Sequence, residues 1–264
     1  MPFEELKERQ AKVWSSGPYQ GVTETVADVH REVIERFNPR PGVRFLDLAC
    51  GTGAVAELAV RSGADVVAVD FAPGLIEIAK QRAAERGLEI DYRVGDCEAL
   101  DLEDASFDQV ASTFGVMFAP DHRAVAGELA RVTKPGGEIA LACWMPESGA
   151  AQMFAVLQPF QPPPPQGAGN QFDWGRDDYV SELLGGDFEL EFKAIDSPLE
   201  LESGEAAWAL FSQEFGPTKT LVASLDDERR EELRGNFVEL HEDSRTNGGI
   251  RFSRMYLLTL GTRK

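Results

Sequence analysis

One short segment contains an aspartate and two glycines spaced closely enough to act on a single ligand. It is RFLDLACGTGAVAEL, residues 44–58, in which Asp47 precedes Gly51 and Gly53. An apolar run leads into the glycines and a helical pattern follows them. Glycines let the backbone approach a ligand closely, and the first turn of a helix presents free N–H groups. The segment therefore predicts a nucleotide-like ligand above a strand–turn–helix unit.

Two ligands fit such a turn, and nearby acids distinguish them. GTGAVA satisfies the dinucleotide pattern G-x-G-x-x-G/A, with Ala56 in the last place, but this match alone is weak. Asp47 would repel a pyrophosphate and attract an ammonium or a sulfonium. Asp70 ends the next apolar run, where an acid accepts ribose hydroxyls, and Asp96 follows the third run, where it can accept an adenine amino group. A ligand with adenine, ribose and a cationic amino-acid tail is S-adenosylmethionine.

Apolar, strand-like runs alternate with helical patterns along the first half of the chain. The predicted strands are residues 43–49, 64–70, 88–94, 107–113 and 138–144, and the predicted helices are 53–63, 72–87 and 121–132. KPGG, residues 134–137, is predicted to be a turn before the last of these strands. The alternation implies right-handed crossovers and a parallel sheet covered by helices on both faces.

The flanking segments are predicted to form a single domain with this core. Residues 1–37 are a helical lid broken at SSGPYQG, and residues 38–147 are the cofactor-binding core. Residues 148–175, which include four consecutive prolines, are assigned to a Pro-rich loop. Within the C-terminal part, residues 176–264, the predictions are a helix over 176–186, strands over 188–201 and 250–260, and a helical, substrate-covering insertion over about 204–243.

The composition narrows the classes of partner. The chain has 264 residues and a formal charge of −19, and so acidic a surface repels phosphate backbones and anionic lipids. Its apolar runs are shorter than a bilayer span, and its charged N-terminus lacks the apolar region of a secretory signal. Cys50, Cys97 and Cys143 show neither metal spacing nor a disulfide framework. We expect a cytoplasmic monomer or homodimer that binds neither nucleic acid, membrane nor metal.

The ordered motifs resemble class I S-adenosylmethionine-dependent methyltransferases of the small-molecule, UbiE-like kind (type 11/25-like). FLDLACGTG resembles the first motif, usually written with Gly where Ala49 stands. VVAVDFAPGLIEIAKQRA and VGDCEAL resemble the second and third, and residues 107–137 resemble the segment from the fourth strand through the Pro-Gly-Gly turn. The resemblance covers about residues 43–145. It implies a doubly wound, Rossmann-like α/β fold with seven strands in the order 3-2-1-4-5-7-6, the last antiparallel.

The resemblance also implies roles for the matching positions. The implied cofactor-binding residues are Trp14, Tyr19, Asp47, Ala49, Gly51, Gly53, Asp70, Phe71, Asp96, Cys97, Ser112 and Thr113. Asp47 would hold the methionine tail, Asp70 the ribose and Asp96 the adenine. Trp14 and Tyr19 suit a lid, since aromatic faces attract a sulfonium. Phe114, Met117 and Trp144 are assigned to the methyl acceptor, with Phe172 and Trp174 as lesser candidates.

No strong constellation for a catalytic base is visible in the sequence. His241 and His122 are the candidates, and each is more simply interpreted as a solvated histidine. Glu239 lies in the same predicted helical insertion as His241 and is open to the same two interpretations, a substrate contact or a surface residue. Cys50 begins a helix, where a thiol pKa can fall, but a small packing residue is the simpler interpretation.

The resemblance implies transfer of a methyl group from S-adenosylmethionine to an O, N, S or C nucleophile of a small molecule. Two other classes stay open. One is an NAD-dependent Rossmann oxidoreductase, against which Asp47 argues because of its charge. The other is a protein that binds S-adenosylmethionine without catalysis. The intact motifs disfavour this second alternative.

Overall fold

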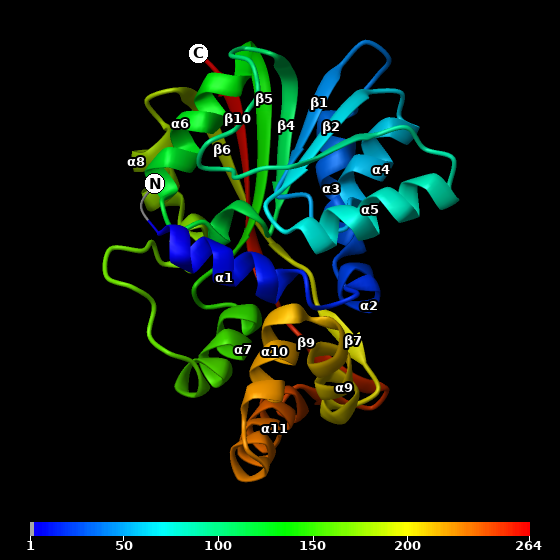
Figure 1. Cartoon of the computed structure of the whole chain (residues 1–264), viewed down its shortest axis with the longest axis vertical. Coiled ribbons are helices and arrows are strands. Elements are labelled where there is room, and N and C mark those ends of the chain that lie inside the picture. The colour runs from blue at the N-terminus through cyan, green and yellow to red at the C-terminus, as the bar shows by residue number, and fades with distance from the viewer. Residues whose placement is uncertain (1–2) are drawn as a thin grey trace.

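A seven-stranded sheet forms the centre of the protein in a computed structural model that describes residues 3–264 (Figure 1). Met1 and Pro2, part of the predicted lid, lie outside the described residues. The strands of the sheet are β1 (Arg44–Leu48), β2 (Asp65–Asp70), β3 (Asp91–Val94), β4 (Phe107–Thr113), β5 (Thr133–Trp144), β6 (Phe188–Asp196) and β10 (Met255–Arg263). Their order is β3-β2-β1-β4-β5-β10-β6. The first five strands pair in parallel, and β10 runs antiparallel to both neighbours. Since β10 is the seventh strand of this sheet along the chain, the predicted order is confirmed.

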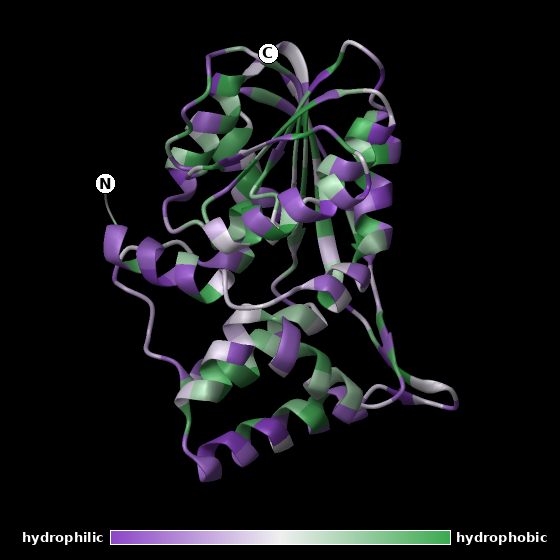
Figure 2. Ribbon diagram, turned by 45° about the vertical axis from the view of Figure 1, so that its right-hand side comes forward, coloured by the Kyte–Doolittle hydropathy of each residue, from purple (hydrophilic) through white to green (hydrophobic). Residues whose placement is uncertain are grey.

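Helices cover both faces of this sheet (Figure 1). On one side lie α3 (Ala27–Phe37), α4 (Ala54–Arg61) and α5 (Pro73–Glu85), and on the other α6 (His122–Val132) and α8 (Asp177–Leu184). In α3, Val29, Val33 and Phe37 recur every four residues and are buried, so the helix has one apolar face. The central strands β1, β2, β4 and β10 are predominantly hydrophobic (Figure 2), as strands buried on both faces require. The edge strands β3 and β6 carry exposed polar residues.

A second body of helices lies beyond the end of the sheet at which the parallel strands finish (Figure 1). It consists of α7 (Gly149–Leu157), α9 (Gly204–Glu214), α10 (Gly216–Ser224) and α11 (Asp227–Glu242), with a small sheet of β7 (Leu199–Leu201), β9 (Gly249–Phe252) and β8 (Arg245–Thr246). Its apolar residues form a hydrophobic core separate from that of the main sheet. The predicted helical insertion before the final strand is confirmed.

The N-terminal helices lie between these two bodies (Figure 1). They are α1 (Glu4–Trp14) and α2 (Gln20–Glu24), separated at the predicted break. The Gly216 N–H donates to the Tyr19 hydroxyl at 3.0 Å, and the hydroxyls of Ser16 and Thr220 lie 3.0 Å apart. These bonds join the N-terminal segment to the helical insertion, about 200 residues later in the chain.

Two strand predictions were too long. The segments 188–201 and 250–260 each divide, because β6 and β10 stay in the main sheet while β7 and β9 enter the small one. The first break holds Pro198, which has no N–H for a ladder. The two breaks bond to each other: Ser197 N–H donates to the Arg254 carbonyl at 3.2 Å, and Arg254 N–H donates to the Asp196 carboxylate at 3.0 Å.

Two predicted loops contain regular structure. Gly149–Leu157 is a helix, because the apolar run after Ser148 packs into the second core and Ser148 accepts the Ala151 N–H at 3.2 Å. Residues 161–170 remain irregular, as their prolines predict. KPGG belongs to β5, whose register against β4 shifts between Phe107 and Gln109.

The short 3-10 helices are η1 (Val116–Phe118), η2 (Gln158–Phe160) and η3 (Gln171–Gly175). Within residues 3–264, every helix is too short or too polar to cross a bilayer.

Candidate active site

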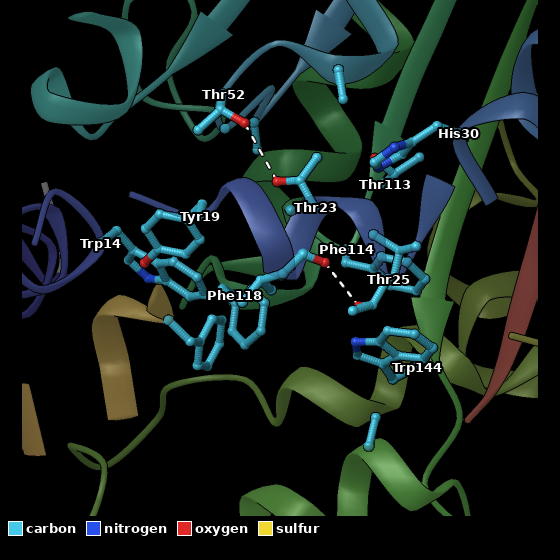
Figure 3. Close-up of a pocket in the computed structure, with 18 of the residues that line it drawn as sticks. Trp14, Tyr19, Thr23, Thr25, His30, Thr52, Thr113, Phe114, Phe118 and Trp144 are labelled. Atoms are coloured by element: carbon cyan, nitrogen blue, oxygen red, sulfur yellow. Dashed lines mark hydrogen bonds between the residues drawn. The ribbon is translucent and has the colours of Figure 1, made fainter. Parts of the chain in front are cut away.

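A largely aromatic cavity lies along the carboxyl ends of the parallel strands. The turn after β1 and the ends of β2, β4 and β5 form one side of it, which is the edge where doubly wound sheets bind their ligands. Residues of α2, α3, α7, α9, α11 and β9 form the other walls. Figure 3 shows Trp14, Tyr19 and Phe118 on one side of the cavity and Trp144 on the other. The hydroxyls of Thr23 and Thr52, 3.4 Å apart, connect α2 with the β1 turn.

Gly51 and Gly53, in the turn after β1, have different structural roles. Gly51 has a φ of 56° and lines the cavity, and a Cβ there would meet no atom within 4 Å. This leaves room for a ligand against the backbone. Gly53 has a φ of 82°, and the Tyr92 hydroxyl occupies the place where its Cβ would lie. Gly53 is therefore required by packing beneath the turn rather than by the cavity.

Asp47 and Asp70 are buried carboxylates beside this turn. Asp47 is 1% exposed and accepts the Ala56 N–H at 2.9 Å, and it lies beneath the cavity wall rather than in it. Asp70 lines the cavity and accepts the Gly51 N–H at 2.8 Å and the Ala72 N–H at 2.9 Å. Burial raises the pKa of Asp47 to about 7 and that of Asp70 to about 6. Within residues 3–264 neither carboxylate has a cationic partner, so the site favours a ligand that brings positive charge.

Asp96 is engaged by the N-terminal helix. The Lys7 ammonium lies 2.7 Å from one Asp96 oxygen, and the Glu98 N–H donates to the other at 2.9 Å. Lys7 also forms an ion pair with Glu98. Neither Asp96 nor Cys97 lines the cavity. The predicted adenine contact is therefore covered by α1 in this structure.

Two residues at the carboxyl ends of β4 and β5 form a flat aromatic wall. The rings of Phe114 and Trp144 stack at 3.7 Å with an angle of 8° between their planes. Both residues line the cavity, as do Thr113 and Phe71. Ser112 and Met117 are fully buried beneath the wall and do not reach the cavity.

Three residues with left-handed backbones line the cavity. Tyr19, Ala49 and Phe114 have φ values of 58°, 53° and 54°, which side chains other than glycine adopt at a cost. Such conformations concentrate at functional sites. Trp14 lies beside Tyr19 with ring centroids 6.1 Å apart, so both predicted lid aromatics face the cavity (Figure 3).

The two candidate histidines are both buried, so their interpretation as solvated residues was wrong. His241 is 0% exposed and lines the cavity. His122 is 4% exposed but lies elsewhere, with Nδ1 2.8 Å from the Tyr179 hydroxyl and its ring against Trp174. Glu239 is exposed. Phe172 and Trp174 do not line the cavity.

Sequence reasoning missed two cationic or titratable residues of the cavity. His30 on α3 lines it, and burial lowers the pKa of its ring to about 4. Arg254 also lines it, although it is 4% exposed. A signal was present for Arg254, because a charge interrupts the apolar run that ends the chain. Cys50 lines the cavity, but burial and the charges of Asp47 and Asp70 raise the pKa of its thiol.

Comparison with known proteins identifies the family. Residues 46–141 match the family described as "Methyltransferase domain". Uncharacterized protein Rv1405c of Mycobacterium tuberculosis is 35% identical over 252 residues, which cover 93% of this chain and 91% of that protein. The chain belongs to the class I S-adenosylmethionine-dependent methyltransferase family. The predicted family and the predicted cofactor, which defines the family, are thereby confirmed.

Other relatives of this methyltransferase have named activities. The demethylmenaquinone methyltransferase of Renibacterium salmoninarum is 39% identical over 112 residues, 42% of this chain and 46% of that protein. The structure of geranyl diphosphate C-methyltransferase from Streptomyces coelicolor A3(2), in complex with Mg2+, geranyl diphosphate and S-adenosyl-L-homocysteine, superimposes with a TM-score of 0.55 at 16% identity. That match covers 90% of this methyltransferase and 80% of the other chain, and it shows a shared fold.

The cofactor fits the residues present in this methyltransferase. Gly51 leaves open space against the backbone, and Asp47 and Asp70 are buried without a counter-ion among the described residues. S-adenosylmethionine brings an ammonium and a sulfonium, which supply the missing positive charge. Within residues 3–264, no group of three or more His, Cys, Asp or Glu side chains is arranged to hold a metal ion.

Proposed function

We propose that this methyltransferase transfers a methyl group to a small, largely apolar molecule held in the aromatic cavity. The observation that carries the proposal is the lining of the cavity beyond the β1 turn. Trp14, Phe118, Trp144, Phe154 and Phe215 contribute apolar surface, and they come from five separate segments that line the cavity. A concave, largely apolar cavity suits a small molecule better than a macromolecule.

The cofactor is proposed to lie on the sheet side of the cavity. Asp47 and the backbone of Ala49, Gly51 and Gly53 would hold its methionine part, and Asp70 its ribose. Phe71 would flank the adenine, and Asp96 and Cys97 would contact the edge of the base. Each Asp96 oxygen has a second lone pair, so it can accept from adenine while it keeps Lys7.

The chain's own residues would position the acceptor and exclude water. When bound, S-adenosylmethionine supplies an activated methyl group on a sulfonium. Trp14 and Tyr19 would cover that charge, and Thr113 would lie beside it. The stacked Phe114 and Trp144 rings offer a flat surface along which an acceptor can be aligned with the methyl group.

A screen for release of S-adenosylhomocysteine tests this function. Purified protein is incubated with S-adenosylmethionine and soluble phenols, thiols, amines and carbon acids, and product is measured by mass spectrometry. We expect release of S-adenosylhomocysteine with apolar compounds from at least one of these four acceptor classes. Binding of S-adenosylmethionine without turnover of any class would favour the non-catalytic alternative, and tighter binding of NADH would favour an oxidoreductase.

Replacement of Asp70 tests the cofactor assignment. We expect Asp70→Ala to weaken the binding of S-adenosylmethionine by about 1–3 kcal/mol, the scale of a lost charged hydrogen bond. Asp65→Ala, at the exposed opposite end of β2, is the matched control and should leave the affinity unchanged. Calorimetric titration measures both. Equal affinities for the two variants would contradict the proposed role of Asp70.

A further inference from the structure

Arg254 brings an unpaired positive charge to the cavity. Its Nε donates to the Ser197 carbonyl at 2.9 Å, and its two terminal nitrogens donate to the Thr25 hydroxyl at 3.2 Å and the Thr25 carbonyl at 2.6 Å. All three partners are neutral. Among residues 3–264 no carboxylate forms an ion pair with the guanidinium, and the charges of Asp28 and Asp196 act on it from beyond that distance. A guanidinium has five N–H groups, so two remain for a ligand.

His241 brings a free acceptor to the same cavity. Its Nδ1 lies 2.7 Å from the Phe237 carbonyl, which only accepts, so Nδ1 carries the hydrogen in the neutral ring. Nε2 then has a lone pair, is buried, and has no partner among the described residues. The rings of Phe237 and Phe252, each centred 4.5 Å away, hold the imidazole in place.

The charges around His241 favour its neutral form. Burial lowers the pKa of the ring, and the positive charge of Arg254 lowers it further. Glu242, on the same helix, and the Phe237 carbonyl act in the opposite direction. An unprotonated Nε2 accepts hydrogen bonds and donates none.

One kind of ligand group satisfies both residues. A hydroxyl donates to Nε2 and accepts from the guanidinium, whereas a carboxylate would set its lone pairs against Nε2 and an ammonium would be repelled by Arg254. The guanidinium covers one face of the Trp144 ring, 5.4 Å from its centre, and Phe114 is stacked on the other, so the apolar body of the ligand would lie among the other aromatic side chains of the cavity. We infer that His241 and Arg254 bind a hydroxyl of an aromatic methyl acceptor whose ring lies among these side chains.

This inference rests on the proposed function, and it concerns recognition of the acceptor. His241 lies on α11 and Arg254 directly before β10, whereas the methyl group is proposed to lie beside Thr113 at the end of β4. The hydroxyl held by His241 and Arg254 is therefore assigned as the group that orients the acceptor.

Three naphthalene probes test the inference on protein saturated with S-adenosylhomocysteine. 2-Naphthol carries a hydroxyl, 2-methoxynaphthalene lacks the donor, and 2-naphthoate is an anion without a donor. We expect 2-naphthol to bind at least about tenfold tighter than the other two, the scale of a buried hydrogen bond to a charged group. Fluorescence titration of the probes gives the three dissociation constants.

Two variants connect this preference with the named residues. His241→Asn can keep an N–H toward the Phe237 carbonyl while it removes the Nε2 acceptor, and Arg254→Met removes the charge. Both should abolish the preference for 2-naphthol. The matched controls are His122→Asn, a buried histidine outside the cavity, and Arg263→Met, an arginine that also bonds carbonyl oxygens and covers a ring, here Phe188. Both controls should keep the preference.

Binding of S-adenosylhomocysteine separates the possible failures. If wild-type protein binds it but prefers 2-naphthoate or shows no preference, the inference is wrong while the proposed function stands. If wild-type protein does not bind it, the proposed function fails and the inference fails with it. If Arg254→Met alone loses the binding of S-adenosylhomocysteine, that variant is misfolded and His241→Asn decides the inference. An unchanged preference of His241→Asn for 2-naphthol would then overturn the inference.

Discussion

Two buried carboxylates dominate the chemistry of individual residues. Among residues 3–264, Asp47 and Asp70 have no counter-ion and are bonded only to backbone N–H groups, and burial raises the pKa of both. A folded-state pKa above the unfolded value stabilises the fold at acidic pH, and this stabilisation is lost as the pH rises through the folded pKa. The free protein is therefore expected to lose stability between about pH 4 and pH 7, where a bound cation would restore it.

The affinity for S-adenosylmethionine should depend on pH for the same reason. With pKa values of about 7 for Asp47 and about 6 for Asp70, protons must leave before Asp47 can pair with the ammonium of the ligand and Asp70 can accept its ribose hydroxyls. Affinity should rise from pH 5 to about pH 8, one unit above the pKa of Asp47, and level off above, with protons released on binding. Calorimetry in buffers of different ionisation enthalpy measures the release. Asp70→Asn should flatten the profile, and a profile that is already flat in wild-type protein would contradict this explanation.

The backbone of Ala49 offers a second test at this scale. Its φ of 53° costs an alanine about 1–2 kcal/mol, and glycine avoids this cost but loses about 0.5–1 kcal/mol through its freer unfolded chain. We expect Ala49→Gly to raise the free energy of unfolding by up to about 1 kcal/mol. Denaturant titration measures it. Ala105→Gly, at an exposed residue with φ 45°, is the control and should behave alike. The Ala49 methyl group lies close to Gly115, where an added Cβ would clash with it. A loss of stability in Ala49→Gly alone would show that the packing of this methyl group outweighs the backbone strain.

At the scale of elements, α1 acts as a cover anchored at both ends. Near its start Lys7 is paired with Asp96 and Glu98, and at its end Trp14 packs against Phe118 with ring centroids 4.8 Å apart. None of the residues of α1 is fully buried, so these end contacts hold the helix in place. Elements held by few contacts open more easily than a core strand.

Removal of the Lys7 anchor should loosen α1. We expect Lys7→Met to increase the hydrogen exchange of α1 amides several-fold while the exchange of β1 and β4 stays unchanged. The lysine side chain is 12% exposed, so its ion pairs are partly shielded from solvent. Lys12→Met, at an exposed lysine of the same helix, is the control. Equal exchange in the two variants would show that Lys7 does not anchor the helix.

Across the whole molecule, the sequence was informative where chemistry is local. The motifs between residues 43 and 145 place their glycines and acids within single strand–turn–helix units, so these residues indicated the cofactor. The family resemblance that the motifs carry implied the order of the strands. The acceptor side is different. His30, Phe215 and Arg254 meet there from three distant segments, and no spacing along the chain relates them. The splitting of the last strands was missed for the same reason, since it depends on a second sheet assembled from residues 199–252.

The bonds from Ser16 and Tyr19 to the helical insertion imply an order of events during turnover. Because these bonds join the N-terminal segment and the insertion into a single cover, we expect both ligands to share one entrance. The proposed cofactor position lies behind the acceptor, against the sheet. We therefore expect S-adenosylmethionine to enter first and S-adenosylhomocysteine to leave last. Product inhibition would then be competitive between these two molecules and non-competitive toward the acceptor, whereas a random mechanism would require the cover to open in two independent parts.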